Sequence, residues 1–269
     1  MALGSNNPRL EQSEGNNVAR TAGNGSNGVQ SIDRAFVLLD VLARAGGAMA
    51  VNELVTASGL PQPTVHRLAR TLMDTGHVRQ LASRRYTLGP RLISLGEGAA
   101  RMLGARAQPD LALLADEVGE TTKLGLLDGE RAVYVAQVPG RHSMRMFTEV
   151  GRRVYLHSTG IGKAILAQLP AESVRRTLLA AATPRLTERT LVDVEEILDE
   201  LEKIRRTGHA DSDEEQEVGL RCIAVAVPGA PTPAAISLSG PTYRLTPERT
   251  DDAVRHLHAT ARRVSEYFS

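Results

Sequence analysis

Polar and basic side chains gather on one side of a short apolar segment in the first third of the chain. From Pro63 onward, apolar residues recur at helical spacing, and the other side of the predicted helix is polar. A second basic group, Arg84-Arg85, lies in a polar stretch between two short apolar runs. Arginine bonds to phosphates and to base edges, so the pattern fits contact with DNA. The candidate DNA-binding residues are Gln62, Thr64, His66, Arg67, Arg70, Arg84 and Arg85.

A glycine-rich turn, Thr159-Gly160-Ile161-Gly162, precedes a second predicted helix. Exposed N–H groups at a helix start attract anions, and glycine lets a ligand approach the backbone closely. Lys163 suggests a phosphate-binding loop, but His157 and Ala164 replace the glycine and the metal-binding hydroxyl that such a loop requires. The turn therefore predicts either a small-anion site or a tight strand-to-helix connection whose glycines serve packing.

Two hydroxyls and the single thiol lie on apolar segments near the C-terminal end. Ser237 and Ser239 alternate along a predicted strand, so both side chains point to one face. Buried hydroxyls cost free energy unless they are hydrogen-bonded, so they bond either to backbone or to a small polar ligand. Cys222 begins another apolar strand, where a buried cysteine by itself acts as a small hydrophobic residue.

Catalytic chemistry has weaker support. Paired carboxylates can serve acid–base catalysis, and five acids cluster here: Asp211, Asp213, Glu214, Glu215 and Glu217. Such a run before a strand is usually a solvated loop. His256 and His258 are two apart on a predicted helix and face different directions, and one cysteine excludes a disulfide or a cysteine-cluster metal site. We therefore expect no enzyme activity, metal or cofactor; an enzyme-like sensor domain is the less favoured alternative.

The composition fits two globular domains. The 269 residues are 42% hydrophobic and 23% charged, and no apolar run approaches the roughly 18 residues of a membrane span. One cysteine and no signal-peptide pattern suit a reducing, cytoplasmic setting. Half of residues 1–28 are Asn, Gly or Ser, which predicts a disordered tail. The net charge of +1 divides into +4 over residues 1–104 and −3 over the rest, so an anionic partner is expected to bind the N-terminal part of the chain.

Three short helices and a hairpin are predicted next. Ser31 is a plausible N-cap of a helix that Gly46-Gly47 stops, and a second helix covers 51–58. Gly59 suits a left-handed residue before the third helix, and Gly76 ends that helix. Residues 77–88 fit a hairpin with a basic tip, and 90–103 a linking helix. This order is typical of a winged helix-turn-helix, whose third helix enters the major groove; the alternative is a small helical domain with a solvated arginine face.

The rest of the chain predicts an α+β domain with an antiparallel sheet. Asp128-Gly129 is a strong hairpin signal between two of the strands. Thr190 can cap one helix that ends before Gly208, and Thr246-Pro247 can start the last helix. The predicted strands are 121–127, 132–138, 144–150, 222–227 and 234–239, and the earlier helices are 158–169 and 171–181.

Several motifs in register resemble the IclR-type transcriptional regulators. They are residues 29–35 (VQSIDRA), 59–68 (GLPQPTVHRL), 85–92 (RYTLGPRL), 151–164 (GRRVYLHSTGIGKA) and 208–224 (GHADSDEEQEVGLRCIA). Many relatives have Lys-Ser where this chain has Gln62-Pro63, which alters base or phosphate contacts at the helix start. Many have two adjacent Asp where it has Ser212-Asp213, which bears on the ligand pocket.

The resemblance implies a domain plan and a set of partners. The plan is a tail (1–28), a winged helix-turn-helix domain (29–91), a linker helix (92–104) and a GAF-like α/β effector-binding domain (105–269). The partners are double-stranded operator DNA, a small-molecule effector and a second copy, as a dimer or dimer of dimers. Repression is the common mode in the family, and activation is the alternative. The effector is expected to be a small organic acid, with glyoxylate or purine-breakdown intermediates, aromatic acids and short-chain acids all open. The implied effector-binding residues are Gly160, Ile161, Ser212, Cys222, Ser237 and Ser239.

Overall fold

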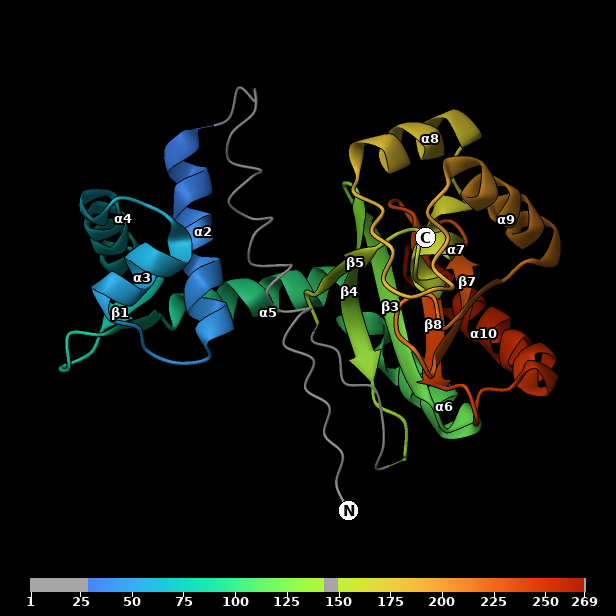
Figure 1. The fold of residues 1–269 in the computed structure, drawn as a ribbon. Helices are drawn as coiled ribbons and strands as arrows, with labels where there is room; N and C mark the ends of the chain where they lie inside the picture. Colours follow the sequence, from blue (N-terminus) through green and yellow to red (C-terminus); the bar gives the residue numbers. More distant parts are fainter. Residues whose placement is uncertain (1–28, 143–149, 269) are drawn as a thin grey trace, which may run out of the picture. The chain divides into compact units, whose positions relative to one another are not determined.

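A computed structural model describes residues 29–142 and 150–268 (Figure 1). The chain divides into two compact units, residues 1–98 and 99–269, which are described separately below. The predicted tail 1–28 lies outside the described residues, as does the predicted strand 144–150 except for Val150, which lies in a turn. In the described ranges no helix is both long and apolar enough to cross a membrane.

Unit 1 has the three helices and the hairpin that the sequence predicts. The helices are α2 (Gln30–Ala45), α3 (Val51–Ser58) and α4 (Gln62–Asp74), and the antiparallel hairpin joins β1 (Val78–Gln80) to β2 (Tyr86–Leu88). Helix α2 begins one residue before the expected cap: Val29 occupies the N-cap position, and no side chain caps this end. The apolar sides meet in one core that includes Leu38, Leu42, Leu54, Val65, Leu68 and Tyr86.

The turn between α3 and α4 sets the direction of the third helix. Gly59 has φ +66°, and its N–H donates to the Val55 carbonyl over 3.0 Å, so it closes α3 in the left-handed conformation that glycine adopts without strain. Pro63 follows in the first turn of α4, where a missing N–H costs nothing. A helix α5 (Arg91–Leu103) begins after the wing, within a residue of its predicted start.

Unit 2 is built on a six-stranded antiparallel sheet with the order β5-β4-β3-β8-β7-β6. The strands are β3 (Thr121–Asp128), β4 (Arg131–Val138), β5 (Arg153–Tyr155), β6 (Ala210–Asp213), β7 (Leu220–Val227) and β8 (Ala234–Pro241). The predicted hairpin at Asp128-Gly129 is confirmed, because β3 pairs with β4 across it. Both edge strands, β5 and β6, are absent from the sequence prediction. They are short and rich in charged or hydroxyl residues, so they lack an apolar strand pattern.

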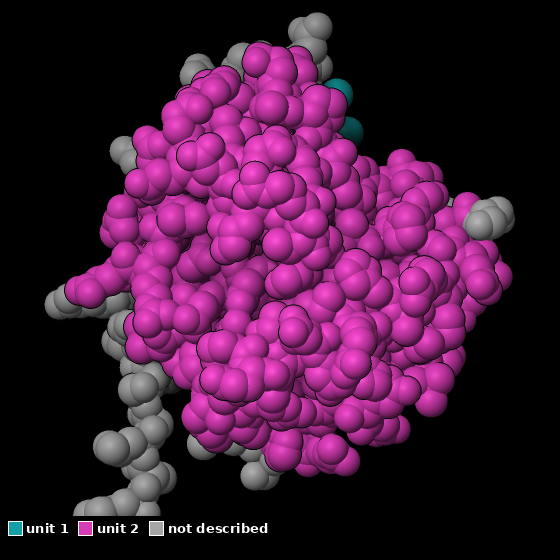
Figure 2. Space-filling model, turned by 90° about the vertical axis from the view of Figure 1, so that its right-hand side faces the viewer, with its two compact units in different colours: residues 1–98 teal, residues 99–269 magenta. Residues whose placement is uncertain are grey.

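Helices cover both faces of this sheet. Helices α6 (Gln108–Val118) and α10 (Thr250–Ser265) pack on one face with Leu111, Ile236 and Leu257 in the shared core. Helices α7 (Gly160–Leu166), α8 (Ala171–Ala180) and α9 (Val194–Thr207) belong to the core of the other face, here named the α7 face. Figure 1 shows α8 and α9 grouped apart from α6 and α10, and Figure 2 views unit 2 from the side of α9 and α10. Helix α6, which covers one face, is not among the predicted helices.

Two helix starts differ from the prediction. Thr190 does not cap α9; Asp193 does, because its Oδ1 accepts the N–H groups of Glu195 and Glu196 at 2.9 and 3.1 Å. The Thr190 hydroxyl instead closes a turn by accepting two backbone N–H groups, and it donates to the Glu215 carbonyl over 2.6 Å. Pro247 opens a short 3-10 turn, and α10 itself begins at Thr250.

Glu217 of the acidic cluster is exposed in the loop after β6, but the other four acids have partners within the domain. Asp211 and Asp213 lie in β6, where Asp211 Oδ1 accepts from Arg221 Nε at 3.0 Å and Asp213 pairs with Arg189. Glu215 is buried and accepts from Lys163 Nζ at 2.5 Å. The same Nζ donates to the Asp211 carbonyl over 2.6 Å. Lys163, the Glu215 carboxylate and the Asp211 carbonyl therefore form a structural clamp that joins α7 to β6 and to the turn after it.

The Lys163 clamp generates a stability prediction. Lys163 is 1% exposed, so Lys163→Met leaves the Glu215 carboxylate buried without its cation. We expect a loss of about 3–5 kcal/mol in the free energy of unfolding at neutral pH. Burial raises the pKa of Glu215, and Lys163 opposes this rise. The deficit should therefore shrink as pH falls through the folded-state pKa, because protonation removes the stranded charge.

Chemical denaturation between pH 8 and pH 5 measures this effect. Lys203→Met is the matched control, because Lys203 is 61% exposed where it pairs with Glu200, so its loss should cost no more than about 1 kcal/mol. Lys163→Met/Glu215→Leu should regain part of the lost stability, since neither charge remains. Equal losses for Lys163→Met and Lys203→Met at neutral pH would contradict the clamp.

Candidate functional site

Helix α4 presents a polar row opposite its apolar stripe. Val65, Leu68 and Ala69 are buried in the core of unit 1. Gln62, His66 and Arg70 are exposed at a spacing of four residues, so they follow one another along a single side of the helix. Arg67 is exposed beside this row, and Thr64 near the helix start is half-buried. All five predicted residues of this helix thus lie at its start or along the side away from the core.

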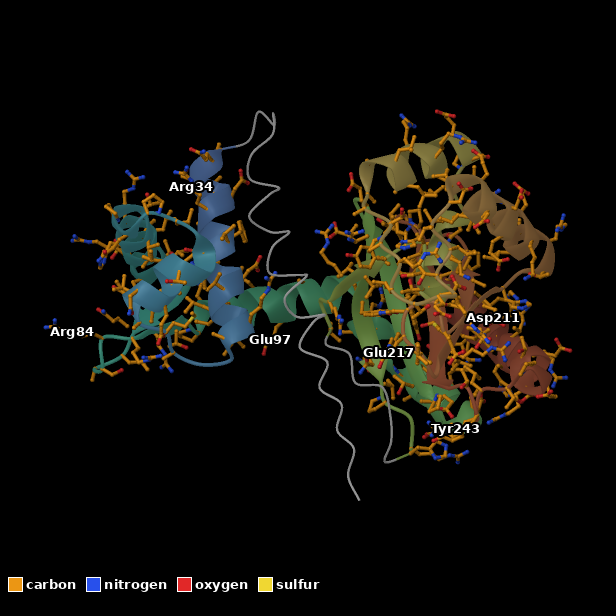
Figure 3. The ribbon with its side chains drawn as sticks, in the orientation of Figure 1. Arg34, Arg84, Glu97, Asp211, Glu217 and Tyr243 are labelled. Carbon is orange, nitrogen blue, oxygen red and sulfur yellow. The ribbon has the colours of Figure 1, made fainter. Side chains whose placement is uncertain are left out.

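The two wing arginines differ in their surroundings. Arg84 lies at the tip with φ +60° and is exposed; Figure 3 shows its side chain at the far end of the wing. Arg85 is half-buried, and it donates from Nε to the Ala48 carbonyl at 2.9 Å and from its guanidinium to Glu53 Oε2 at 2.8 Å. The same Glu53 oxygen accepts the Ala50 N–H at the start of α3. Arg85 therefore anchors the wing to α3, and Arg84 is the arginine held at the tip.

Four of the six predicted effector residues lie close together on the α7 face. The strand register aligns Ser212 with Cys222 and Cys222 with Ser239, so these three side chains form one row across β6, β7 and β8. Ser237 stands two residues before Ser239 on the same side of β8, opposite Ala224. All four are buried. The alternation read from the sequence for Ser237 and Ser239 is confirmed.

The hydroxyls of this face differ in their hydrogen bonds. Ser212 Oγ donates to the Ser158 carbonyl over 3.0 Å, and Ser239 Oγ donates to Cys222 Sγ over 3.5 Å. Ser237 Oγ and Ser158 Oγ are buried, and neither has a hydrogen-bond partner within the described ranges. A buried hydroxyl without a partner costs free energy. Ser237 and Ser158 are therefore hydroxyls of this face that a ligand could satisfy.

The glycine-rich turn is shaped by packing. A side-chain carbon at Gly160 would lie 2.8 Å from the Cys222 carbonyl oxygen and 3.0 Å from its Sγ, so only glycine fits against β7. Helix α7 is only seven residues long, and the Thr159 hydroxyl accepts the Gly162 N–H at 3.0 Å. The Ile161 side chain is fully buried against Gly125 of β3. The geometry gives Gly160 a packing role, and the backbone of Gly160 and Ile161 is the part of this turn that is left for a ligand.

Lys123 is a polar residue of this face that the motifs do not single out. It lies on β3 directly opposite Ser237, is 4% exposed, and holds its Nζ 4.8 Å from the centre of the Tyr134 ring. Burial lowers the pKa of Lys123; the nearby Arg152 adds to this, whereas Cys222 opposes it. Period-two alternation puts Lys123 on the same face as Gly125, but only the pairing of β3 with β8 brings it beside Ser237. No group of His, Cys, Asp or Glu side chains in the described part of the chain could hold a metal ion.

Comparisons with known proteins agree with both units. The IclR helix-turn-helix domain matches residues 31–82, and the IclR C-terminal domain of bacterial transcriptional regulators matches residues 100–266. The chain is 36% identical to the transcriptional repressor IclR of Escherichia coli over 231 residues, which cover 83% of this chain and 84% of the relative. The crystal structure of an IclR transcriptional regulator from Alicyclobacillus acidocaldarius has a TM-score of 0.78 and 28% identity, covering 90% of this chain and 100% of that one.

A further solved structure shares the fold. An IclR homolog from Microbacterium hydrocarbonoxydans, complexed with 4-hydroxybenzoate, has a TM-score of 0.77 at 21% identity and covers 88% of this chain and 98% of that one. The matched family and the relative from Escherichia coli are transcriptional regulators, not enzymes. The two matched domains together span the described helix-turn-helix and the whole sheet domain. This chain belongs to the IclR family of DNA-binding transcriptional regulators.

Proposed function

We propose that this regulator is a cytoplasmic repressor whose operator binding is controlled by a small organic acid bound on the α7 face. Repression is supported by the function named for the relative from Escherichia coli. The observation that carries ligand control is the pair of buried hydroxyls, Ser158 and Ser237, without partners in the described residues. A reporter gene under the native operator separates this from activation: deleting the regulator should raise expression, and a fall would indicate an activator.

The proposed DNA contacts follow from the exposed side of α4 and the tip of the wing. Gln62, His66, Arg67 and Arg70 would read base edges and phosphates from the major groove, with Thr64 at the helix start. Arg84 would bind a backbone phosphate, because it sits at the exposed tip. Arg85 would act on DNA mainly by holding the wing against Glu53.

Arginine substitutions test this face. Arg67→Ala and Arg70→Ala should each weaken operator binding by about 1–3 kcal/mol without unfolding unit 1, because both side chains point away from its core. Arg84→Ala should weaken specific and non-specific DNA binding alike and make the salt dependence shallower. Gel shifts at several salt concentrations measure both effects. Arg255→Ala is the control, since Arg255 is an exposed residue of α10 in unit 2. Unchanged affinity of both α4 variants would refute the recognition-helix assignment.

The proposed effector site is the α7 face around Ser237, with Ser212, Cys222 and Ser239 in the adjoining row and the backbone of Gly160 and Ile161 at its border. A ligand that bonds to Ser237 or Ser158 would remove the cost of a buried hydroxyl without a partner. A carboxylate or a ketone oxygen suits such donors. Aromatic acids, such as the 4-hydroxybenzoate bound by the homolog from Microbacterium hydrocarbonoxydans, therefore join glyoxylate and short-chain acids as probes.

Ser237→Ala separates ligand binding from folding. Its hydroxyl has no partner in the described residues, so its removal should leave the melting temperature unchanged or slightly higher. Affinity for the acid that releases the operator should fall by about tenfold or more. Calorimetric titration of glyoxylate, pyruvate and 4-hydroxybenzoate, with thermal melts, measures both. Ser173→Ala on the partly exposed α8 is the control and should alter neither. A ligand that binds Ser237→Ala and wild type equally would place the site elsewhere.

A second copy is the remaining proposed partner. One α4 offers few base-reading side chains, so two copies on near-palindromic half-sites are expected. Ile93 and Leu95 on α5 are 64% and 52% exposed, which makes this helix the proposed contact between copies.

Charged substitutions on α5 test self-association. Ile93→Asp/Leu95→Asp should shift the protein toward monomer in sedimentation at micromolar concentration and weaken operator binding. Ser94→Asp, at an exposed polar position between them, should do neither. A wild-type monomer that still binds its operator tightly would refute the dimer.

A further inference from the structure

Lys123 is a buried ammonium group inside the sheet domain, on the face where the effector is proposed to bind. It stands directly across the β3–β8 ladder from Ser237, whose hydroxyl has no partner in the described residues. On its other side, β4 places Gln137 opposite Lys123, and Gln137 Oε1 is likewise buried without a partner in the described ranges. Ser237, Lys123 and Gln137 thus form a polar row across three neighbouring strands.

The neighbouring row consists of hydrogen-bond donors. Ser212, Cys222 and Ser239 point to the α7 face, whereas the alternation of β6 and β7 turns Asp211, Asp213 and Arg221 to the other face. Asp211 is held there by Arg221 and Asp213 by Arg189. The two rows therefore contain one ammonium group, a thiol and three serine hydroxyls. The Ser212 and Ser239 hydroxyls already donate within the domain, so the Ser237 hydroxyl is the one of the three whose proton is left for a ligand. Hydroxyls and an ammonium group suit a ligand rich in acceptor oxygens.

We propose that Lys123 is a specificity-determining residue that binds an anionic group of the effector, so that the site selects carboxylates over the corresponding neutral amides. This inference rests on the proposed effector site and adds to it the charge of the ligand and the residue that reads that charge. The Tyr134 ring, 4.8 Å from Nζ, holds the ammonium group on this face through a cation–π contact. A carboxylate placed between Nζ and Ser237 Oγ would receive one charged and one neutral hydrogen bond.

Binding of an anion should also be linked to protonation. Burial lowers the pKa of Lys123, and a bound carboxylate would raise it again because opposite charge favours the ammonium form. Carboxylate affinity should therefore be greatest at pH values below the pKa of Lys123 in the ligand-free protein and fall as pH rises through it. At pH values near or above that pKa, ligand binding takes up protons. The heat measured by calorimetry then depends on the ionisation enthalpy of the buffer.

The first experiment uses the wild-type full chain and matched probes. Pyruvate and pyruvamide, and 4-hydroxybenzoate and 4-hydroxybenzamide, differ chiefly in the charge that Lys123 would meet. Calorimetric titration at pH 7 should show the carboxylate of at least one pair binding about 10- to 100-fold more tightly than its amide. Equal binding within each pair, or tighter binding of the amides, would overturn the role of Lys123 but leave a ligand site on this face intact. If no acid or amide of the panel binds, both this inference and the proposed effector site fail.

The second experiment changes the lysine. Lys123→Gln should lose the preference for the carboxylate and the fall of affinity at high pH, and Lys123→Arg should retain most of the preference. The chain has only three lysines, and Lys203, exposed on α9, supplies the control Lys203→Gln, which should behave as wild type. Operator affinity without ligand should be unchanged in Lys203→Gln. A merely structural Lys123 would instead lower the melting temperature of Lys123→Gln and weaken acid and amide equally, and that result would overturn the proposal.

Discussion

A sheet covered by helices on both faces leaves no solvent side for its polar residues. Every residue of β8 from Ala234 to Gly240 is buried, and so are the first six of β3. Any hydroxyl, thiol or ammonium group on these strands must find a partner inside the domain or in a ligand. The α6 and α10 face is mostly aliphatic, and its buried Thr122 hydroxyl donates to the Leu111 carbonyl, whereas the α7 face concentrates serines, Cys222 and Lys123 on neighbouring strands. This asymmetry between the two faces is the physical basis for assigning the effector to one of them.

The Lys163 clamp keeps the border of that face in place. Lys163 reaches from α7 to the Asp211 carbonyl and to Glu215, while Ser212, between them on β6, bonds to the Ser158 carbonyl just before α7. Gly160 packs against Cys222 from the other direction. The turn that leads into α7 is thus fixed by a charge pair, a hydrogen bond and a close backbone approach. Such a border suits the proposed effector site, because a pre-formed site loses less ordering entropy on binding than a loop would.

The sequence predicts what depends on local pattern. The helices of the DNA-binding unit, the Gly59 turn and the common face of Ser237 and Ser239 follow from periodicity and turn residues. The edge strands β5 and β6 do not, because they form by pairing with β4 and β7 and have no apolar pattern of their own. The role of Lys123 cannot be predicted from local pattern either. It depends on the strand order, which places β3 next to β8 although more than a hundred residues separate the two strands. At Arg85 a local pattern predicts more than the structure supports. The basic wing tip predicts that both Arg84 and Arg85 contact phosphates, but Glu53 holds the Arg85 side chain.

Control of DNA binding by a ligand requires that the ligand favour one arrangement of the chain over another. The division between the two units falls within α5, between Gly98 and Ala99, so this helix is the direct covalent route between them. Side-chain carbons at Gly96 and Gly98 would meet nothing within 4 Å, so packing against the described residues does not require glycine at either position. Each glycine instead lowers the stability of the helix by about 1 kcal/mol relative to alanine. Under the proposed ligand control, an effector contributes only its difference in affinity between two states, and the two glycines lower the stability of the helix that this difference would have to alter.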